Sequence, residues 1–90
     1  MRVGCILYHP DFINDLKKLD IFIRDRAIKS EKLFHVNPLH PSLRLHALKG
    51  RLKGLWSISV TLKVRIIFSR MENGDIVFLS IGHHNIYQSL

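Results

Sequence analysis

The amino-acid sequence predicts an α+β fold in which an N-terminal strand and a helical region pack on one face of a small, mainly antiparallel sheet. Three observations support this prediction. An apolar segment, residues 2–8, precedes a stretch with helical spacing. Residues 55–60 and 64–70 alternate apolar and polar side chains, as strands do. The pair Asn73-Gly74 is typical of a tight hairpin turn that leads into a third strand.

The N-terminal half is predicted to form a strand followed by helices. Pro10 suits the first position of a helix, and Asp11 complements the positive helix N-terminus. The apolar residues of the next two dozen positions recur at intervals of three and four, which lines one helical face: Phe12, Leu16, Leu19, Ile23 and Ala27. Periodicity leaves open whether Asp20 separates two helices. Residues 37–42 contain two prolines, so we expect a loop there.

The first two strands of the C-terminal half are predicted to pair through a three-residue connection, residues 61–63. This register places Val60 opposite Val64, Ile58 opposite Ile66 and Trp56 opposite Phe68, so that one face of the sheet is apolar. On the other face, Ser59 lies opposite Arg65.

The third strand, residues 76–81, is predicted to return from the Asn-Gly turn with Arg70 opposite Asp75. That register puts Phe68 opposite Val77, Ile66 opposite Leu79 and Arg65 opposite Ser80. We therefore expect Ser59, Arg65 and Ser80 to form a polar row on the face away from the apolar core.

Charge is distributed very unevenly along this chain. The 90 residues carry a net charge of +7, from 14 Lys and Arg against 7 Asp and Glu, and we expect them to form one domain, residues 1–90. No Asp or Glu lies between Glu31 and Glu72, whereas this interval holds Lys32, Arg44, Lys49, Arg51, Lys53, Lys63, Arg65 and Arg70. A surface built from this acid-free segment should attract an anion, and a phosphate backbone fits best.

Several other classes of site are disfavoured. The histidines are scattered, without a Cys pair or HExxH spacing, and no GxxxxGK[ST] or GxGxxG loop is present, so we expect neither a metal nor another cofactor. No apolar stretch reaches the ~20 residues that span a bilayer. With a single cysteine, Cys5, an internal disulfide is impossible, and we expect a cytoplasmic protein.

The C-terminal half also supplies a set of basic side chains and histidines without a carboxylate: His46, Lys49, Arg51, Lys53, Arg65, His83 and His84. Imidazole can take a proton from a ribose 2′-hydroxyl or give one to a leaving 5′-oxygen, and Arg can stabilise a phosphorane. Metal-free RNA cleavage needs only these groups. Residue types alone leave simple phosphate contact as an equal alternative.

Three segments resemble successive motifs of one known family: LHALKGRLKGLWSISV, RIIF and DIVFLSIGHHNIY. They are similar to the RelE/ParE toxin superfamily, particularly the branch of RelE/StbE or YafQ-like messenger-RNA interferases of type II toxin-antitoxin systems. The resemblance covers nearly the whole chain. It implies a RelE-like fold with a curved sheet whose helix-free face holds the RNA site.

The resemblance also implies roles for particular residues. His46, Arg65 and His84 correspond to catalytic positions, and Tyr87 corresponds to an aromatic residue that stacks on a base. Contact with the RNA is expected from Lys49, Arg51, Lys53, Ser59 and His83, the last as a substitute for His84. The implied activity is metal-independent cleavage of mRNA on the ribosome, and the implied partner is a cognate antitoxin.

This chain departs from the family pattern at three points. Ser59 stands where some relatives have a basic residue or His, and Lys63 stands where the YafQ pattern has Asp. The spacing from His84 to Tyr87 is one residue shorter than in the GxHxxxY form. Two alternatives therefore stay open: a ParE-like inhibitor that binds DNA gyrase, and a catalytically degenerate homologue that only binds an antitoxin.

Overall fold

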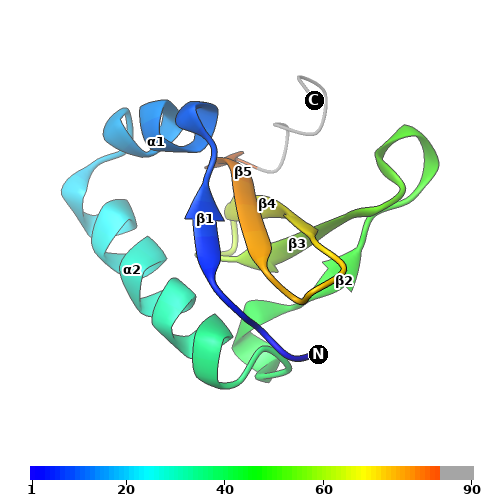
Figure 1. Ribbon diagram of the computed structural model, residues 1–90. Helices are drawn as coiled ribbons and strands as arrows, with labels where there is room; N and C mark the ends of the chain where they lie inside the picture. The colour runs from blue at the N-terminus through cyan, green and yellow to red at the C-terminus, as the bar shows by residue number, and fades with distance from the viewer. Residues whose placement is uncertain (84–90) are drawn as a thin grey trace.

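The computed structural model describes residues 1–83 and places the helices against one face of a sheet (Figure 1). Along the chain the elements are β1 (Ile6–Tyr8), α1 (Pro10–Lys17), α2 (Ile21–Val36), the 3₁₀ turn η1 (Pro41–Leu43), β2 (His46–Ala47), the 3₁₀ turn η2 (Gly50–Leu52), β3 (Leu55–Ser59), β4 (Val64–Arg70) and β5 (Ile76–His83).

Within the described residues the sheet has five strands in the order β1-β5-β4-β3-β2. β1 runs parallel to β5, whereas the other neighbouring strands are antiparallel. The predicted α+β fold with a mainly antiparallel sheet is therefore confirmed. The N-terminal strand is shorter than expected, because pairing with β5 begins only at Ile6.

Capping side chains explain where the two helices begin. His9 accepts a hydrogen bond from the backbone N–H of Asp11 at 3.0 Å, and Pro10 occupies the first turn of α1 as predicted. Asp20 separates α1 from α2, since its carboxylate accepts the N–H of Ile23 at 3.0 Å. Among residues 1–83, the helices are too short or too polar to cross a bilayer.

Aromatic rings join α2 to the centre of the sheet. Phe34 of α2 is completely buried, and its ring centroid lies 5.0 Å from that of Phe68 on β4 and 6.2 Å from that of Phe78 on β5. Phe12 of α1 packs on Phe78 with the centroids 5.3 Å apart. The core therefore occupies the helix side of the sheet, and Ser57, Ser59 and Arg65 face the other way.

The register predicted between β3 and β4 is confirmed. Trp56 pairs with Phe68, Ile58 with Ile66 and Ser59 with Arg65. The three-residue connection is closed by the N–H of Val60, which donates to the carbonyl of Val64 at 2.9 Å.

The register predicted between β4 and β5 is wrong. Arg70 pairs with Ile76 instead of Asp75, because the turn closes through the N–H of Met71, which donates to the carbonyl of Asp75 at 2.8 Å. A β-bulge follows: Phe68 pairs with Phe78, whereas Ile67 pairs with Ser80, so Leu79 is an extra residue on β5.

The bulge also changes the expected polar row. Arg65 lies opposite Gly82, not Ser80, and Ile66 lies opposite Ile81, not Leu79. The hydroxyl of Ser80 instead donates to the Asp15 carboxylate of α1 at 3.1 Å.

Candidate functional site

The candidate site is the sheet face turned away from α2, which we call the polar face and define by His46, Ser57, Ser59 and Arg65. Directly paired residues of neighbouring strands share a face. His46 pairs with Ser57, and Ser59 pairs with Arg65, so all four belong to the face opposite the core residues Ile58 and Ile66. Three strands thus bring together residues that span 20 positions of the sequence.

Arg65 is the half-buried cation of this face. Its Nη1 donates to the backbone carbonyl of Thr61 at 2.7 Å, which fixes the guanidinium against the β3–β4 turn. It forms no ion pair with a carboxylate of residues 1–83. Its neighbour on β5 is Gly82, which has no side chain to cover it. The remaining guanidinium N–H groups are therefore available to an anion.

Ser59, which pairs with Arg65, has an unusual environment. The residue is 5% exposed, and its Oγ is buried without a hydrogen-bond partner among residues 1–83. A buried hydroxyl without a partner is destabilising, which makes it a candidate for a functional role.

His46 is exposed on β2, at the outer edge of the sheet. Its Nδ1 lies 3.1 Å from the carbonyl oxygen of Arg44. A carbonyl can only accept, so Nδ1 is the donor in this contact and Nε2 of the neutral ring is left as a proton acceptor. In this tautomer the imidazole can act as a general base through Nε2.

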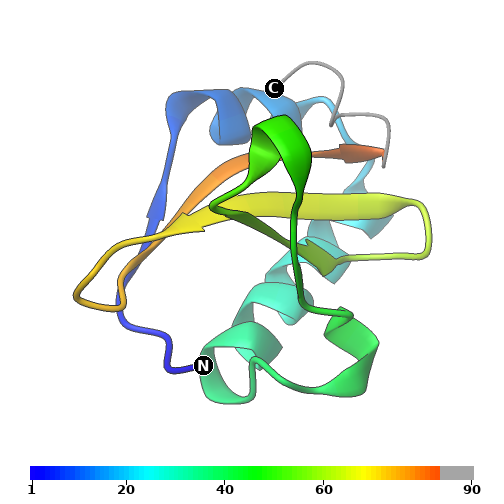
Figure 2. The ribbon, with the colours of Figure 1, turned by 90° about the vertical axis from the view of Figure 1, so that its right-hand side faces the viewer.

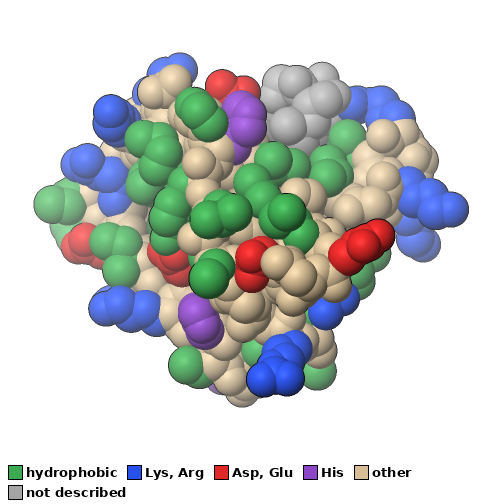
Figure 3. Space-filling view, in the orientation of Figure 1, with side chains coloured by type: hydrophobic (Ala, Val, Ile, Leu, Met, Phe, Trp, Pro, Cys, Tyr) green, Lys and Arg blue, Asp and Glu red, His purple; other side chains and the backbone are tan. Residues whose placement is uncertain are grey.

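The cations predicted to bind phosphate lie in the β2–β3 connection. Lys49, Arg51 and Lys53 flank or belong to η2, and all three are exposed. The connection projects from the sheet in Figure 1 and passes in front of the helix-free face in Figure 2. Lys and Arg side chains gather on it in Figure 3. These cations therefore border the polar face without being part of its strands.

The predicted C-terminal residues of the site fall in two places. His83 ends β5, is exposed and pairs with Val64, so the structure does not bring it onto the face of Arg65. His84 and Tyr87 lie outside the described residues. Among residues 1–83, no three His, Cys, Asp or Glu side chains are grouped as a metal ion would require.

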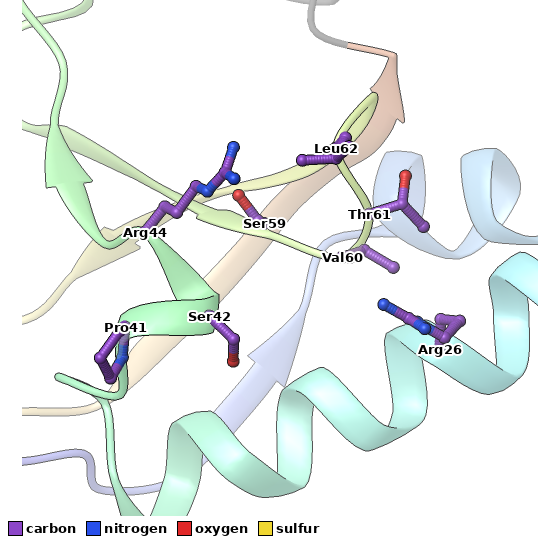
Figure 4. Close-up of a pocket in the computed structure, with 8 residues that line it drawn as sticks. All are labelled: Arg26, Pro41, Ser42, Arg44, Ser59, Val60, Thr61 and Leu62. Carbon is purple, nitrogen blue, oxygen red and sulfur yellow. The ribbon is translucent and has the colours of Figure 1, made fainter.

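A second group of cations was missed by the sequence reasoning. Arg26 of α2 and Arg44, which follows η1, line a cavity of about 390 Å³ beside Ser59 (Figure 4). Arg44 belongs to the acid-free segment, which was a signal. No feature of the sequence indicated Arg26, because a charged residue on an amphipathic helix usually lies on the solvent-exposed face.

Comparisons with known proteins give one family match. Residues 6–86 match the family described as ParE toxin of type II toxin-antitoxin system, parDE. No curated protein matches.

Solved structures give the same fold. YafQ from E. coli strain BL21(DE3) is 20% identical, with a TM-score of 0.77 over 97% of this chain and 98% of that one. A YoeB/ParE toxin from Agrobacterium tumefaciens is 14% identical, with a TM-score of 0.74 over 90% and 99%. The YoeB-YefM toxin-antitoxin complex from Staphylococcus aureus, a heterotetramer, matches at 22% identity and a TM-score of 0.70 over 93% and 99%.

The family match covers far more than half of the chain, and the five-stranded sheet with its two helices is the RelE-like fold of these toxins. The chain therefore belongs to the ParE toxin family of type II toxin-antitoxin systems, within the ParE/RelE superfamily.

Proposed function

We propose that this toxin is a metal-independent endoribonuclease that cleaves mRNA on the ribosome. The observation that carries the proposal is the placement of Arg65. Its guanidinium is held by the Thr61 carbonyl, has no carboxylate partner among residues 1–83, and shares a face with His46. A cation held in place without a counter-charge is suited to a substrate phosphate.

The spacing of these two side chains fits one phosphodiester unit. His46 and Arg65 are separated by two strand spacings and by two residues along the strands. Standard sheet dimensions then put their Cα atoms about 12 Å apart. Both side chains are long enough to reach a phosphodiester group placed between them.

The chemistry follows from these positions. Nε2 of His46 takes the proton of a ribose 2′-hydroxyl, whose oxygen attacks the adjacent phosphorus. Arg65 stabilises the negative charge of the phosphorane. The 5′-oxygen leaves with a proton from a general acid, and we assign this role to His84, which the family resemblance marks as a catalytic position. The product carries a 2′,3′-cyclic phosphate, which hydrolysis opens to a 3′-phosphate.

The first test is primer extension on cellular RNA after induction of the full-length chain. Wild type should give discrete new 5′ ends in messages. Arg65→Ala should abolish them, and Arg65→Lys should leave a fraction, because Lys keeps the charge but loses the planar fork. Arg70→Ala is the matched control, since Arg70 is on the same strand but pairs with Ile76 on the helix side. Unchanged cleavage by Arg65→Ala would make this residue structural.

A second candidate function is inhibition of DNA gyrase by binding, and the specific observation that favours it is the match to the ParE family. A supercoiling assay with purified gyrase separates the two. We expect no inhibition by the wild-type chain. Inhibition of supercoiling without new RNA ends would replace the nuclease proposal.

We also propose that a cognate antitoxin neutralises this toxin by covering the polar face and the basic β2–β3 connection. The heterotetrameric YoeB-YefM structure from Staphylococcus aureus supports such a partner. A net charge of +7 favours an acidic covering segment, whose association should slow as ionic strength rises. Stopped-flow association at low and high salt tests this, and a rate insensitive to salt would exclude the electrostatic model.

A further inference from the structure

The cavity beside Ser59 lies at the outer edge of β3. β2 pairs only with Trp56 and Ser57, so it does not extend along the end of β3. The space there is enclosed by α2, η1 and the β3–β4 turn (Figure 4). We call it the edge pocket; it is lined by Arg26, Pro41, Ser42, Arg44, Ser59, Val60, Thr61 and Leu62.

The edge pocket is positively charged. Arg26 and Arg44 come from different elements and are both exposed, and no Asp or Glu lines the pocket. Neither guanidinium forms a hydrogen bond or ion pair with another of residues 1–83. Two cations that face one space without a counter-ion favour binding of an anion.

The buried hydroxyl of Ser59 gives an independent indication of a ligand. Its oxygen has no partner among residues 1–83, and in Figure 4 it points toward the guanidinium end of Arg44. An anion held by Arg44 would supply the acceptor that this hydroxyl lacks. Arg44 is an exposed side chain on a flexible stem, so it can turn outward to admit the anion.

The backbone at Arg44 is also unfavourable for its side chain. Its φ is 47°, in the left-handed region that glycine and asparagine adopt far more readily. Non-glycine residues in such a backbone conformation cluster at ligand sites.

We propose that the edge pocket binds a backbone phosphate of the RNA strand that passes over Arg65. Ser59 connects the two sites, since its hydroxyl borders the pocket while its strand partner is Arg65. Two separate guanidinium groups and a hydroxyl suit the several oxygens of a phosphate better than the two of a carboxylate. This inference rests on the proposed nuclease function, of which it is a second phosphate subsite.

The first experiment measures the pocket without any RNA. Inorganic phosphate is titrated into the full-length chain at constant ionic strength, and ¹H–¹⁵N spectra follow the arginine Nε–H signals and the amide signals of residues 59–62. We expect saturable shifts there. Arg26→Gln and Arg44→Gln should each weaken binding on the order of tenfold, the effect of losing one charge-assisted hydrogen bond. Arg24→Gln, also exposed on α2 but outside the pocket, is the matched control.

The second experiment identifies the source of the phosphate. A 2′-O-methyl oligoribonucleotide cannot be cleaved, so its affinity reports binding alone. The double variant Arg26→Gln/Arg44→Gln should bind it more weakly and lower the slope of log K against log salt by about 0.7, the value for one phosphate on a single strand.

The outcomes separate this inference from the nuclease proposal. If inorganic phosphate caused the same chemical-shift changes in the Arg26 and Arg44 variants as in wild type, the proposed phosphate site in the edge pocket would be wrong. If the double variant lost binding of inorganic phosphate but kept the wild-type affinity for the oligonucleotide, the RNA subsite would also be wrong. That result would point to an acidic side chain of the antitoxin as the ligand. A wild-type chain that binds phosphate in the pocket but never cleaves RNA would refute the nuclease while leaving the anion site in place.

Discussion

Replacing Ser59 by alanine should stabilise this protein. The hydroxyl is buried and has no partner among residues 1–83, and such a group destabilises by about 1–3 kcal/mol relative to a satisfied one. Alanine removes the oxygen and leaves a small void, which offsets part of the gain. We expect a net gain of about 1 kcal/mol in the free energy of unfolding, or about 4–8 °C in Tm for a domain of this length.

Ser80 provides the matched comparison. It is buried to a similar degree, at 6% exposure against 5% for Ser59, but its hydroxyl donates to Asp15 at 3.1 Å. Ser80→Ala removes a hydrogen bond to a carboxylate, which contributes about 1.5–3 kcal/mol when dry and nearer 1 kcal/mol here, since Asp15 is half-exposed. The two serine-to-alanine changes should therefore shift the stability in opposite directions.

The assay is thermal unfolding of the full-length chain followed by circular dichroism, with urea denaturation at 25 °C as a second measure. A Tm for Ser59→Ala below that of wild type, or Tm shifts of the same sign for both variants, would show that the buried Ser59 hydroxyl does not destabilise the fold. Ser59→Ala should at the same time weaken binding of inorganic phosphate. A variant that is more stable but binds less well would show that the hydroxyl is kept for a ligand.

Two further predictions test the core and the N-terminal strand. Phe34→Ala should lower the free energy of unfolding by about 3–5 kcal/mol, because Phe34 is fully buried. Phe22→Ala changes a side chain that is 79% exposed, so it should change the free energy of unfolding by less than about 0.5 kcal/mol. Equal effects of the two variants in urea denaturation would contradict the assigned core. Burial, together with the hydrogen bond to Glu31 and the charge of Glu31, raises the pKa of Tyr8 to about 12, so its contribution to stability is complete below pH 10 and is lost as the pH rises from 10 to 12. In Tyr8→Phe the loss of stability at high pH should be smaller by about 1 kcal/mol, a figure reduced for solvent screening because Tyr8 is 45% exposed. The measurement is urea denaturation of both proteins at pH 9 and pH 11.5. The same loss of stability in both proteins would refute the role given to Tyr8.

The sequence by itself determined the features that depend on neighbouring residues. The order of the elements followed from the change between helical and strand periodicity, and Pro10 marked the start of α1, whereas periodicity left open the break that Asp20 makes before α2. The register of β3 and β4 was predictable because a three-residue connection and a period of two leave one pairing that puts Trp56, Ile58, Ile66 and Phe68 on a single face. That register placed Ser59 opposite Arg65, which is the centre of the candidate site.

Tertiary structure decided the features that depend on distant segments. The bulge at Leu79 shifted the register of β5 against β4, and Ser80 donates to Asp15 of α1 instead of pairing with Arg65. The alternation of apolar and polar residues does not predict an inserted residue. The parallel pairing of β1 with β5 is likewise a long-range contact. The edge pocket joins Arg26 and Arg44, 18 residues apart on a helix and a loop, and only the packing of α2 beside the free edge of β3 brings their charges together. The local sequence pattern thus determined which residues form strands and on which face their side chains lie, whereas the packing of the helices on the sheet determined which charged side chains lie close together.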